Sequence, residues 1–293
     1  MNIFSGLEPI VKTDYPLAGH TWYGLGGPAD YFIRPRTAKE LKDVLRRCEE
    51  NDMPVYVMGF GSNLLVSDDG LRAAVVKLEG NEFGQAVFNG DTVTAGAGAD
   101  LSKLVLKCVQ KGLSGIEALT GIPGSIGGAV KMNAGGRSGD IGSAVMSVTL
   151  MDAHGRIFEK SKPELTFDYR STNITAKFVL AARLALLPAE PEQIMRAVQE
   201  SWIYKKNSQP LNTRNCGCVF KNPPEAPAGA LIDRVGLKGL RAGGAVVSDK
   251  HANFIVAQQG CKSRDVLELI DTIKQKVKEQ SGIELETEIE IWR

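Results

Sequence analysis

The sequence predicts an α+β protein with more than one domain. Its 293 residues exceed what one hydrophobic core usually supports, so we expect two or three domains. Helical periodicity occurs at 37–48, 101–111 and 263–280, and short strand-like runs lie between these segments. This mixture of helical and strand patterns is typical of an α+β fold.

The first helix is predicted by its cap and by its apolar spacing. Thr37-Ala38-Lys39-Glu40 matches a capping box, in which the threonine and glutamate side chains bond to the first backbone N–H groups. Apolar residues follow at i, i+3, i+4 and i+7, from Leu41 to Cys48. The strand VYVM, the loop GFGSNLLVSDDG and the strand AAVVKLEG then complete a β-α-β-β unit.

The pattern changes after residue 80. DTVTAGAG reads as a strand, Asp100 as an N-cap, and LSKLVLKCVQK as a helix that stops at Gly112. A long glycine-rich segment, GIEALTGIPGSIGGAVKMNAGG, follows it. We then expect a hairpin in AVMSVTLMDAHGRIFE with its turn at His154 and Gly155, a strand in KFVLAARLAL, and a helix in PEQIMRAVQESWIYKK.

The last third of the chain ends in a helix and an alternating tail. Residues 207–262 mix loops with short strands such as ANFIVA. We expect Ser263 to cap a long helix that Gly282 ends. In the tail IELETEIEIW, apolar residues alternate strictly with glutamates, which predicts a strand with one apolar face.

Composition excludes several function classes. The net charge is +1, without the basic excess that nucleic-acid binding leaves in a sequence. The N-terminus lacks the pattern of a signal peptide, and the most apolar run, FVLAARLALLPA, is interrupted by Arg183 and too short to span a bilayer. We therefore expect a cytoplasmic protein without membrane insertion. None of the three histidines has a cysteine at ligand spacing, so no metal site is expected.

The loop GFGSN follows a strand and invites a dinucleotide-binding interpretation. The G-x-G-x-x-G fingerprint fails because Leu64 occupies its third glycine position, and no helical period follows. Backbone N–H groups of a glycine-rich turn can still form an anion-binding nest, with Gly59 and Gly61 permitting close approach and Ser62 and Asn63 adding donors. A plain tight turn between strands is the alternative.

A second glycine-rich loop lies in GIPGSIGGAVKMN. Four glycines, at 121, 124, 127 and 128, surround Pro123 and Ser125. Two such loops on neighbouring domains suit a long diphosphate cofactor that lies between them. Tight packing against a sheet is the alternative, because glycine also serves that purpose.

The stretch CGCVFKNPP raises four possible roles for its cysteines: a disulfide, a metal site, packing, or chemistry. With a single residue between Cys216 and Cys218, a disulfide would be strained, and an intracellular protein keeps its thiols reduced. Packing and chemistry remain open on the residues alone.

Several blocks together carry a resemblance to a known family. They are GSNLLVSDDG, GIPGSIGGAVKMNAGG, DYRSTNI, SQPLNTRNCGCVFKNP, ALIDRVGLKGLRAGGAVVSDKHANFIV and LETEIEI. In this order they resemble the UDP-N-acetylenolpyruvoylglucosamine reductases, flavoenzymes of bacterial peptidoglycan precursor synthesis. The resemblance runs from about Thr21 to Ile291 and indicates the shorter, type II subtype.

The resemblance implies a two-domain FAD-binding module of the vanillyl-alcohol-oxidase/PCMH type plus a third α+β substrate-binding domain. We expect FAD-binding subdomain 1 at 1–79 and subdomain 2 at 80–205, completed by a C-terminal strand at 283–293, with the substrate-binding domain at 206–282. FAD would be bound non-covalently. Its expected ligands lie in the two glycine-rich loops: Gly59, Gly61, Ser62, Asn63, Leu64, Gly121, Pro123, Gly124, Ser125, Gly128 and Ala129.

The resemblance also implies the reaction. NADPH would reduce the flavin and leave, and the enolpyruvyl UDP-sugar would then enter the same pocket. Hydride would pass from flavin N5 to the vinyl carbon, and a protein acid would protonate the adjacent carbon. The product is UDP-N-acetylmuramate. We expect the enzyme to be a monomer with this small-molecule partner and no nucleic acid.

The catalytic residues follow from the matching motifs. Arg170 of DYRSTNI matches the arginine beside the substrate carboxylate, and Glu288 of LETEIEIW matches the catalytic glutamate. Cys218 stands where the family normally has its proton-donating serine. The expected substrate-binding residues are Tyr169, Lys206, Lys221 and Asn222.

The cysteine at 218 leaves three interpretations open. It replaces the serine as acid, which a thiol with a reference pKa near ~8.5 can do; the site is impaired and the protein only binds flavin; or Cys216 and Cys218 form a redox pair. At the level of function, the alternatives are a flavin-dependent oxidase of the same fold and a non-catalytic flavin or UDP-sugar binder.

Overall fold

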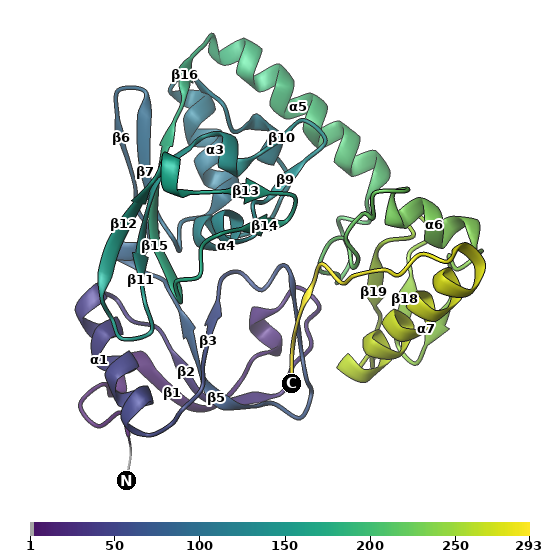
Figure 1. Ribbon diagram of the computed structural model, residues 1–293, viewed down its shortest axis with the longest axis horizontal. Coiled ribbons are helices and arrows are strands. Elements are labelled where there is room, and N and C mark those ends of the chain that lie inside the picture. Colours follow the sequence, from purple (N-terminus) through teal and green to yellow (C-terminus); the bar gives the residue numbers. More distant parts are fainter. Residues whose placement is uncertain (1–2) are drawn as a thin grey trace. The chain divides into compact units, whose positions relative to one another are not determined.

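The computed structural model describes residues 3–293 and contains two compact units (Figure 1). The first contains Asp30–Phe60 and Arg72–Ile203, together with the N-terminal stretch that ends at Asp14. The second contains Tyr15–Ala29, Gly61–Leu71 and Tyr204–Arg293. Its segments at 15–29 and 61–71 come from the part of the chain where we expected only the first FAD-binding subdomain.

The first sheet contains the expected β-α-β-β unit. Its strand order is β1-β2-β5-β3, and β3 and β5 are parallel. The bounds are Val11–Pro16 for β1, Pro28–Ile33 for β2, Val55–Met58 for β3 and Leu71–Lys77 for β5. Helix α1 (Ala38–Glu50) buries the predicted face, Leu41, Val44, Leu45 and Cys48.

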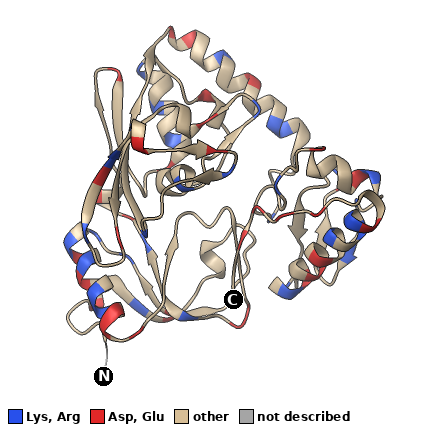
Figure 2. Ribbon diagram, viewed as in Figure 1, with Lys and Arg blue, Asp and Glu red and all other residues tan. Residues whose placement is uncertain are grey.

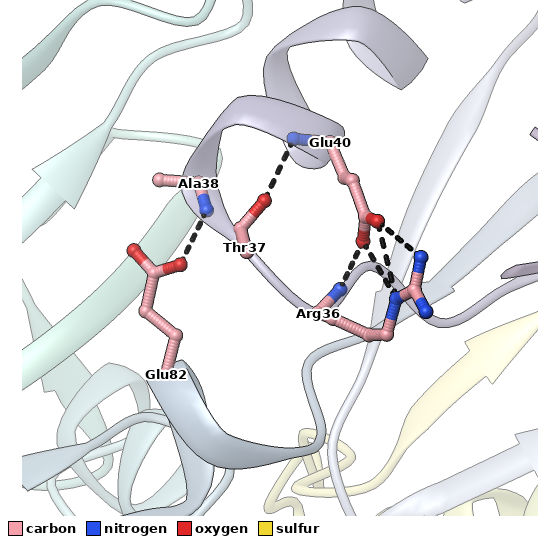
Figure 3. A network of polar contacts seen from close by, with 5 residues as sticks. All are labelled: Arg36, Thr37, Ala38, Glu40 and Glu82. Atoms are coloured by element: carbon pink, nitrogen blue, oxygen red, sulfur yellow. Dashed lines mark hydrogen bonds and ion pairs between the residues drawn. The ribbon is translucent and has the colours of Figure 1, made fainter.

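The cap of α1 differs in one bond from the expected box (Figure 3). Thr37 Oγ1 accepts a hydrogen bond from the N–H of Glu40 at 3.1 Å, as predicted. The Glu40 carboxylate, however, accepts from the backbone N–H of Arg36 at 2.7 Å rather than from that of Thr37, because it also pairs with the Arg36 guanidinium at 2.6 Å. The carboxylate of Glu82 accepts from the N–H of Ala38 at 2.9 Å.

The second sheet has five strands in the order β12-β11-β15-β7-β6, and every neighbouring pair is antiparallel. The bounds are Ala86–Asn89 (β6), Thr92–Gly96 (β7), Val145–Met151 (β11), Ile157–Ser161 (β12) and Phe178–Ala185 (β15). The predicted turn is present between β11 and β12, with Gly155 at φ +78°.

The helices of this part of the chain are α2 (Asn81–Gly84), α3 (Leu101–Gln110), α4 (Ile126–Lys131) and α5 (Pro191–Ser208). Asp100 caps α3 as predicted, since its carboxylate accepts from the N–H of Lys103 at 3.0 Å. The same part of the chain also contains three two-stranded sheets. They pair β8 (Leu113–Ser114) with β16 (Leu187–Pro188), β9 (Gly135–Gly136) with β10 (Gly139–Asp140), and β13 (Phe167–Asp168) with β14 (Ser171–Thr172).

One hydrophobic core fills the first unit. It contains residues on both sides of the expected subdomain boundary at 79/80, such as Leu41 and Val76 before it and Val93, Leu104 and Phe178 after it. All five are buried to within 2 % of full burial. The three-domain division therefore stays a prediction, with its two FAD-binding parts sharing this core.

The second unit has its own core and a three-stranded sheet. The sheet runs β17-β18-β19, with bounds Arg241–Ala242, Ala245–Val247 and Ile255–Ala257, and α7 (Ser263–Ser281) packs on all three strands. Helix α6 (Ala228–Arg234) contacts α7. Gly282 ends α7 in the left-handed region, as predicted.

The start of α7 differs from the prediction for Ser263. Lys262 is the N-cap, and Ser263 is the first helical residue. The Ser263 hydroxyl and backbone N–H both donate to Asp68 Oδ2, at 2.9 and 2.6 Å. A carboxylate from a distant loop therefore supplies the acceptor that we expected from the serine itself.

The C-terminal strand pairs with a different partner from the expected one. β20 (Glu290–Trp292) lies parallel to β4 (Leu64–Val66), with Ile291 opposite Leu65, and it is not a strand of the five-stranded sheet. The strand is shorter than the predicted one at 283–293. The predicted alternation is present in part, because Leu285 and Ile289 are buried in the core of the second unit, whereas Ile283 and Ile291 are half-buried. That apolar face is what holds the tail there rather than beside residues 80–205.

Charges of both signs are mixed along the helices, with blue and red segments alternating on α1 and α7 (Figure 2). Among the helices that the structure describes, none combines the length and apolar character needed to cross a membrane. Within residues 3–293, no group of three or more His, Cys, Asp and Glu side chains is arranged to hold a metal ion.

Candidate active site

The first glycine-rich loop joins β3 to β4. Gly61 adopts φ +65°, and a Cβ at this position would lie 2.1 Å from the carbonyl oxygen of His20, so only glycine fits. Asn63 Nδ2 donates to the carbonyl oxygen of Glu288 at 3.0 Å. A strand, not a helix, follows the loop, in agreement with the failed dinucleotide fingerprint. Ser62 is half-buried and Leu64 is buried in β4.

The second glycine-rich loop leads into α4. Ser125 is the N-cap of this helix, and its Oγ accepts from the N–H of Gly128 at 3.3 Å. A Cβ at Gly59 would lie 2.7 Å from that same Oγ, so residues of the two glycine-rich segments touch within the first unit. The expected juxtaposition of the segments is therefore present at Gly59 and Ser125.

The glycines of α4 serve different purposes. A Cβ at Gly127 would lie 2.8 Å from the Cβ of Ala97, so this glycine is required by packing. Gly128 is exposed, and a Cβ there would meet only Ser125 Oγ, at 3.5 Å. A glycine inside a helix without a packing reason costs about 1 kcal/mol relative to alanine, and it leaves the backbone open to a ligand. The loop fits a flavin that approaches the backbone at Gly128.

The remaining expected FAD ligands line the same loop. Gly121 adopts φ +72°, and it is half-buried, as are Pro123 and Gly124. Ala129 is buried in α4. A mixture of half-buried loop backbone and an exposed glycine at the start of a helix suits a diphosphate, whose oxygens need backbone N–H groups.

Arg170 occupies the tip of a tight hairpin. The register pairs Asp168 with Ser171, so Tyr169 and Arg170 form the two-residue turn between β13 and β14. Arg170 adopts φ +54°, a left-handed conformation that is unfavourable for a residue with a Cβ. Its Nη2 donates to the carbonyl oxygen of Gly135 at 3.0 Å, and its guanidinium carbon lies 5.1 Å from the centre of the Tyr169 ring. Strain of this kind is concentrated at functional residues.

Cys218 and Glu288 lie on neighbouring segments of the second unit. The backbone N–H of Glu288 donates to the carbonyl oxygen of Val219 at 2.7 Å, and Phe220 forms a bridge with Thr287. The tail is thus laid against CGCVFK, which brings two residues 70 positions apart in sequence to adjacent backbone segments. Cys218 is half-buried and forms no disulfide.

Cys216 has a different environment from Cys218. Its side chain is 2 % exposed, and its thiol contacts the carbonyl oxygen of Leu64 at 3.2 Å. Burial raises the pKa of the Cys216 thiol to about 12, so it stays protonated at neutral pH. Neither cysteine is in a disulfide, in agreement with the argument against one.

Asn253, for which no role was predicted, supports this segment directly. Its side chain is 2 % exposed and bonds to Phe220 from both ends: the amide donates to the Phe220 carbonyl at 2.8 Å and accepts from the Phe220 N–H at 2.9 Å. Its own carbonyl accepts from the N–H of Val219 at 2.8 Å. The only sequence signal was its place in the block DKHANFIV.

The expected substrate-binding residues differ in how they are engaged. Lys221 Nζ pairs with Glu286 Oε1 at 2.6 Å, and Asn222 Oδ1 accepts from the N–H of Ala228 at 3.0 Å, at the start of α6. Tyr169 is 51 % exposed. Lys206 is exposed on α5, whereas the neighbouring Lys205 is buried.

Two family models match separate parts of the chain. A family model described as an FAD binding domain matches residues 29–161, and one described as the C-terminal domain of UDP-N-acetylenolpyruvoylglucosamine reductase matches residues 209–292. The UDP-N-acetylenolpyruvoylglucosamine reductase of Moorella thermoacetica is 42 % identical over 98 % of this chain and 95 % of its own length. The enzyme of that name from Bacillus subtilis is 38 % identical over 96 % and 93 %.

A comparison with solved structures leads to the same group of reductases. The crystal structure of UDP-N-acetylenolpyruvylglucosamine reductase from Thermus caldophilus matches with a TM-score of 0.83 and 39 % identity, covering 97 % of this chain and 98 % of that one. A glucose dehydrogenase, Phl p 4.0202, matches with a TM-score of 0.50 and 16 % identity over 76 % of this chain and 53 % of its own, which shows a shared fold alone.

The fold and its matches define a flavoprotein with an α+β FAD-binding module of the vanillyl-alcohol-oxidase/PCMH type, as the sequence predicted. The reductase C-terminal domain accounts for most of the second unit. The chain belongs to the UDP-N-acetylenolpyruvoylglucosamine reductase family, a family of FAD-dependent oxidoreductases, and the predicted resemblance is confirmed.

Proposed function

We propose that this protein uses NADPH to reduce UDP-N-acetylglucosamine enolpyruvate to UDP-N-acetylmuramate, in the cytoplasmic synthesis of peptidoglycan precursors, and that it acts as a monomer. The observation that carries the proposal is the backbone bond between Glu288 and Val219, at 2.7 Å. It puts the one half-buried tail glutamate beside the segment of Cys218, in a chain of the reductase family.

FAD would be held by the backbone of the two glycine-rich segments, residues 59–63 and 121–129. When bound and reduced by NADPH, FAD would supply the hydride for the reaction. Gly128 leaves its backbone open, because a Cβ there would meet only Ser125 Oγ, at 3.5 Å, whereas Gly59 packs against that same Oγ. The donors there are backbone N–H groups and short polar side chains, which suit the diphosphate of the cofactor.

Arg170 would bind the carboxylate of the enolpyruvyl group. Hydride addition to this group builds negative charge next to the carboxylate, and a guanidinium can hold the carboxylate through two parallel bonds while it stabilises the new charge. The strained backbone at φ +54° and the bond to Gly135 fix the direction of the guanidinium. A side chain that is already oriented loses little entropy when the substrate arrives.

Cys218 would deliver the final proton. A thiol is a much stronger acid than the serine alcohol that the family normally has here, and its half-buried position permits access. Glu288, in its protonated form, would assist by hydrogen bonding to the developing enolate. A single positioned acid on one face sets the stereochemistry of the lactyl product.

The UDP diphosphate would be bound by Lys206, Lys221 and Asn222, and Tyr169 would contribute a polar contact to the substrate. Lys221 is paired with Glu286, whose side chain is 72 % exposed. Such an exposed ion pair contributes about 0–1 kcal/mol, so its exchange for a doubly charged diphosphate costs little.

The proposal is tested by following the two half-reactions separately. The purified protein is mixed anaerobically with NADPH, then with UDP-N-acetylglucosamine enolpyruvate, while the flavin spectrum is recorded. We expect bleaching on the first addition and recovery on the second. Recovery with oxygen and no added substrate, together with reduction by an alcohol, would indicate the oxidase. A yellow protein that NADPH does not bleach would indicate the non-catalytic binder.

A further inference from the structure

The segment that follows α4 holds the hairpin that carries Arg170. Residues 131–135 contact the hairpin through three hydrogen bonds, each between a side chain and a backbone carbonyl. They are Thr172 Oγ1 to the carbonyl of Lys131 at 3.2 Å, Asn133 Nδ2 to the carbonyl of Asp168 at 2.9 Å, and Arg170 Nη2 to the carbonyl of Gly135 at 3.0 Å. The hairpin backbone and the guanidinium are thus fixed by the same short segment.

Asn133 is the central member of this segment. Its side chain is 2 % exposed, and both ends of the amide are bonded, since Oδ1 accepts from the N–H of Gly142 at 3.0 Å while Nδ2 donates to Asp168. Its backbone is left-handed, at φ +45°, which asparagine tolerates better than other residues with a Cβ. The chemistry and the conformation of this position both favour asparagine.

The hairpin is also held by the packing of Phe167 on Gly142, a residue that Asn133 binds. A Cβ at Gly142 would lie 2.4 Å from Cγ of Phe167, so the Phe167 ring of β13 rests directly on this glycine. The N–H of Gly142 is the group that bonds to Asn133 Oδ1. The side-chain amide of Asn133 therefore bonds both to the hairpin backbone, at Asp168, and to Gly142, on which the Phe167 ring packs.

The same segment is tied to the expected flavin-binding helix. The N–H groups of Asn133 and Ala134 donate to the carbonyls of Val130 and Ala129, at 3.2 and 2.7 Å. Helix α4 also contacts β14 (Figure 1). A displacement of Asn133 would therefore also shift Arg170 on the hairpin and Ala129 in α4.

We propose that Asn133 is a positioning residue for Arg170, and that it sets the guanidinium relative to the flavin-binding helix without touching the substrate. This inference rests on the proposed role of Arg170. Removal of the amide donor frees the Asp168 carbonyl, loosens the hairpin and lets the strained turn relax. A displacement of about 1 Å of a positioning group can lower a rate about 100-fold.

The test compares two substitutions in a double-mutant cycle on the holoenzyme. Asn133→Asp keeps the size, the acceptor for Gly142 and the tolerance of a left-handed backbone, and in its ionised form it offers no donor to Asp168. We expect the substrate-reducing half-reaction to slow about 10- to 100-fold, with FAD content and flavin reduction by NADPH unchanged. In an Arg170→Lys background the same change should have little further effect, because coupled residues are not additive.

The controls separate positioning from general damage. Asp52→Ala changes another left-handed residue (φ +51°), exposed after α1, and should leave both half-reactions unchanged. If Asn133→Asp does not fold, Asn133→Gly suits the backbone and also removes the amide. Equal slowing of both half-reactions, or full additivity with Arg170→Lys, overturns the inference alone. A normal rate in Arg170→Lys and Arg170→Ala overturns the role of Arg170 and the inference with it.

Discussion

The backbone N–H of Glu288 donates a hydrogen bond of 2.7 Å to the carbonyl oxygen of Val219, which is the residue next to Cys218. This bond lays Glu288 against the segment that carries Cys218, and the exposure of its side chain sets it apart from the other tail glutamates. The side chain of Glu288 is half-buried, whereas the other three tail glutamates are exposed: Glu284, Glu286 and Glu290. Periodicity alone could not distinguish them, because all four lie on the polar face of the same alternating pattern.

The two adjacent glycines of α4 should respond oppositely to alanine. Gly128→Ala fills open space and adds helix propensity, so the unfolding free energy of the apoprotein should rise by up to about 1 kcal/mol while FAD affinity falls. Gly127→Ala would place a Cβ 2.8 Å from that of Ala97, and should destabilise the apoprotein. Urea unfolding and FAD titration measure both. Undiminished FAD affinity in Gly128→Ala would contradict our placement of the cofactor.

Asn253 should matter for stability as much as for catalysis. Asn253→Ala leaves the N–H and carbonyl of Phe220 buried without their partners, which should cost about 2–4 kcal/mol in urea unfolding. Asn212→Ala, an exposed asparagine of the preceding loop, is the matched control and should change stability by less than about 0.5 kcal/mol. Equal effects of the two substitutions would show that the Asn253 bonds contribute little.

The buried thiols should make the protein less stable at alkaline pH. Burial raises the thiol pKa from 9.0 to about 11 for Cys48 and Cys261, and to about 12 for Cys108 and Cys216. Above pH 9 the unfolded chain loses these protons while the folded chain keeps them. The folded state then binds more protons, so the unfolding free energy falls as pH rises towards about 12.

The comparison that isolates this effect is Cys216→Ala. Lysines and tyrosines also titrate in this range, but they are common to both proteins. Over pH 9 to about 12, the variant should lose stability less steeply than the wild type in urea unfolding. Parallel curves would mean that the Cys216 thiol titrates alike in the folded and unfolded chains.

Most local elements could be predicted because their signals are local. The cap at Thr37, the N-cap at Asp100 and the turn at Gly155 each depend on a few neighbouring residues. The partner of the C-terminal strand could not be predicted, because alternation indicates which face is buried and not against what. The same limit applies to Ser263, whose acceptor, Asp68, lies 195 residues away.

In the candidate site too, features with a local signal could be predicted, and features that depend on distant contacts could not. The glycine-rich loops and Cys218 are visible in the sequence through composition and the family motifs. The left-handed backbone of Arg170 is not, because arginine carries no preference for it. Nor are the roles of Asn133 and Asn253, since each holds a segment that is distant in the chain, and an asparagine in a loop has many possible partners.

We propose that the Cys218 thiol delivers the proton that completes the reduction. The most direct measurement is the rate at which UDP-N-acetylglucosamine enolpyruvate reoxidises the NADPH-reduced flavin, in wild type, Cys218→Ser and Cys218→Ala. We expect Cys218→Ser to turn over and Cys218→Ala to lose at least about 100-fold in this step, with flavin reduction by NADPH preserved in both. Reoxidation of Cys218→Ala at the wild-type rate would contradict the claim.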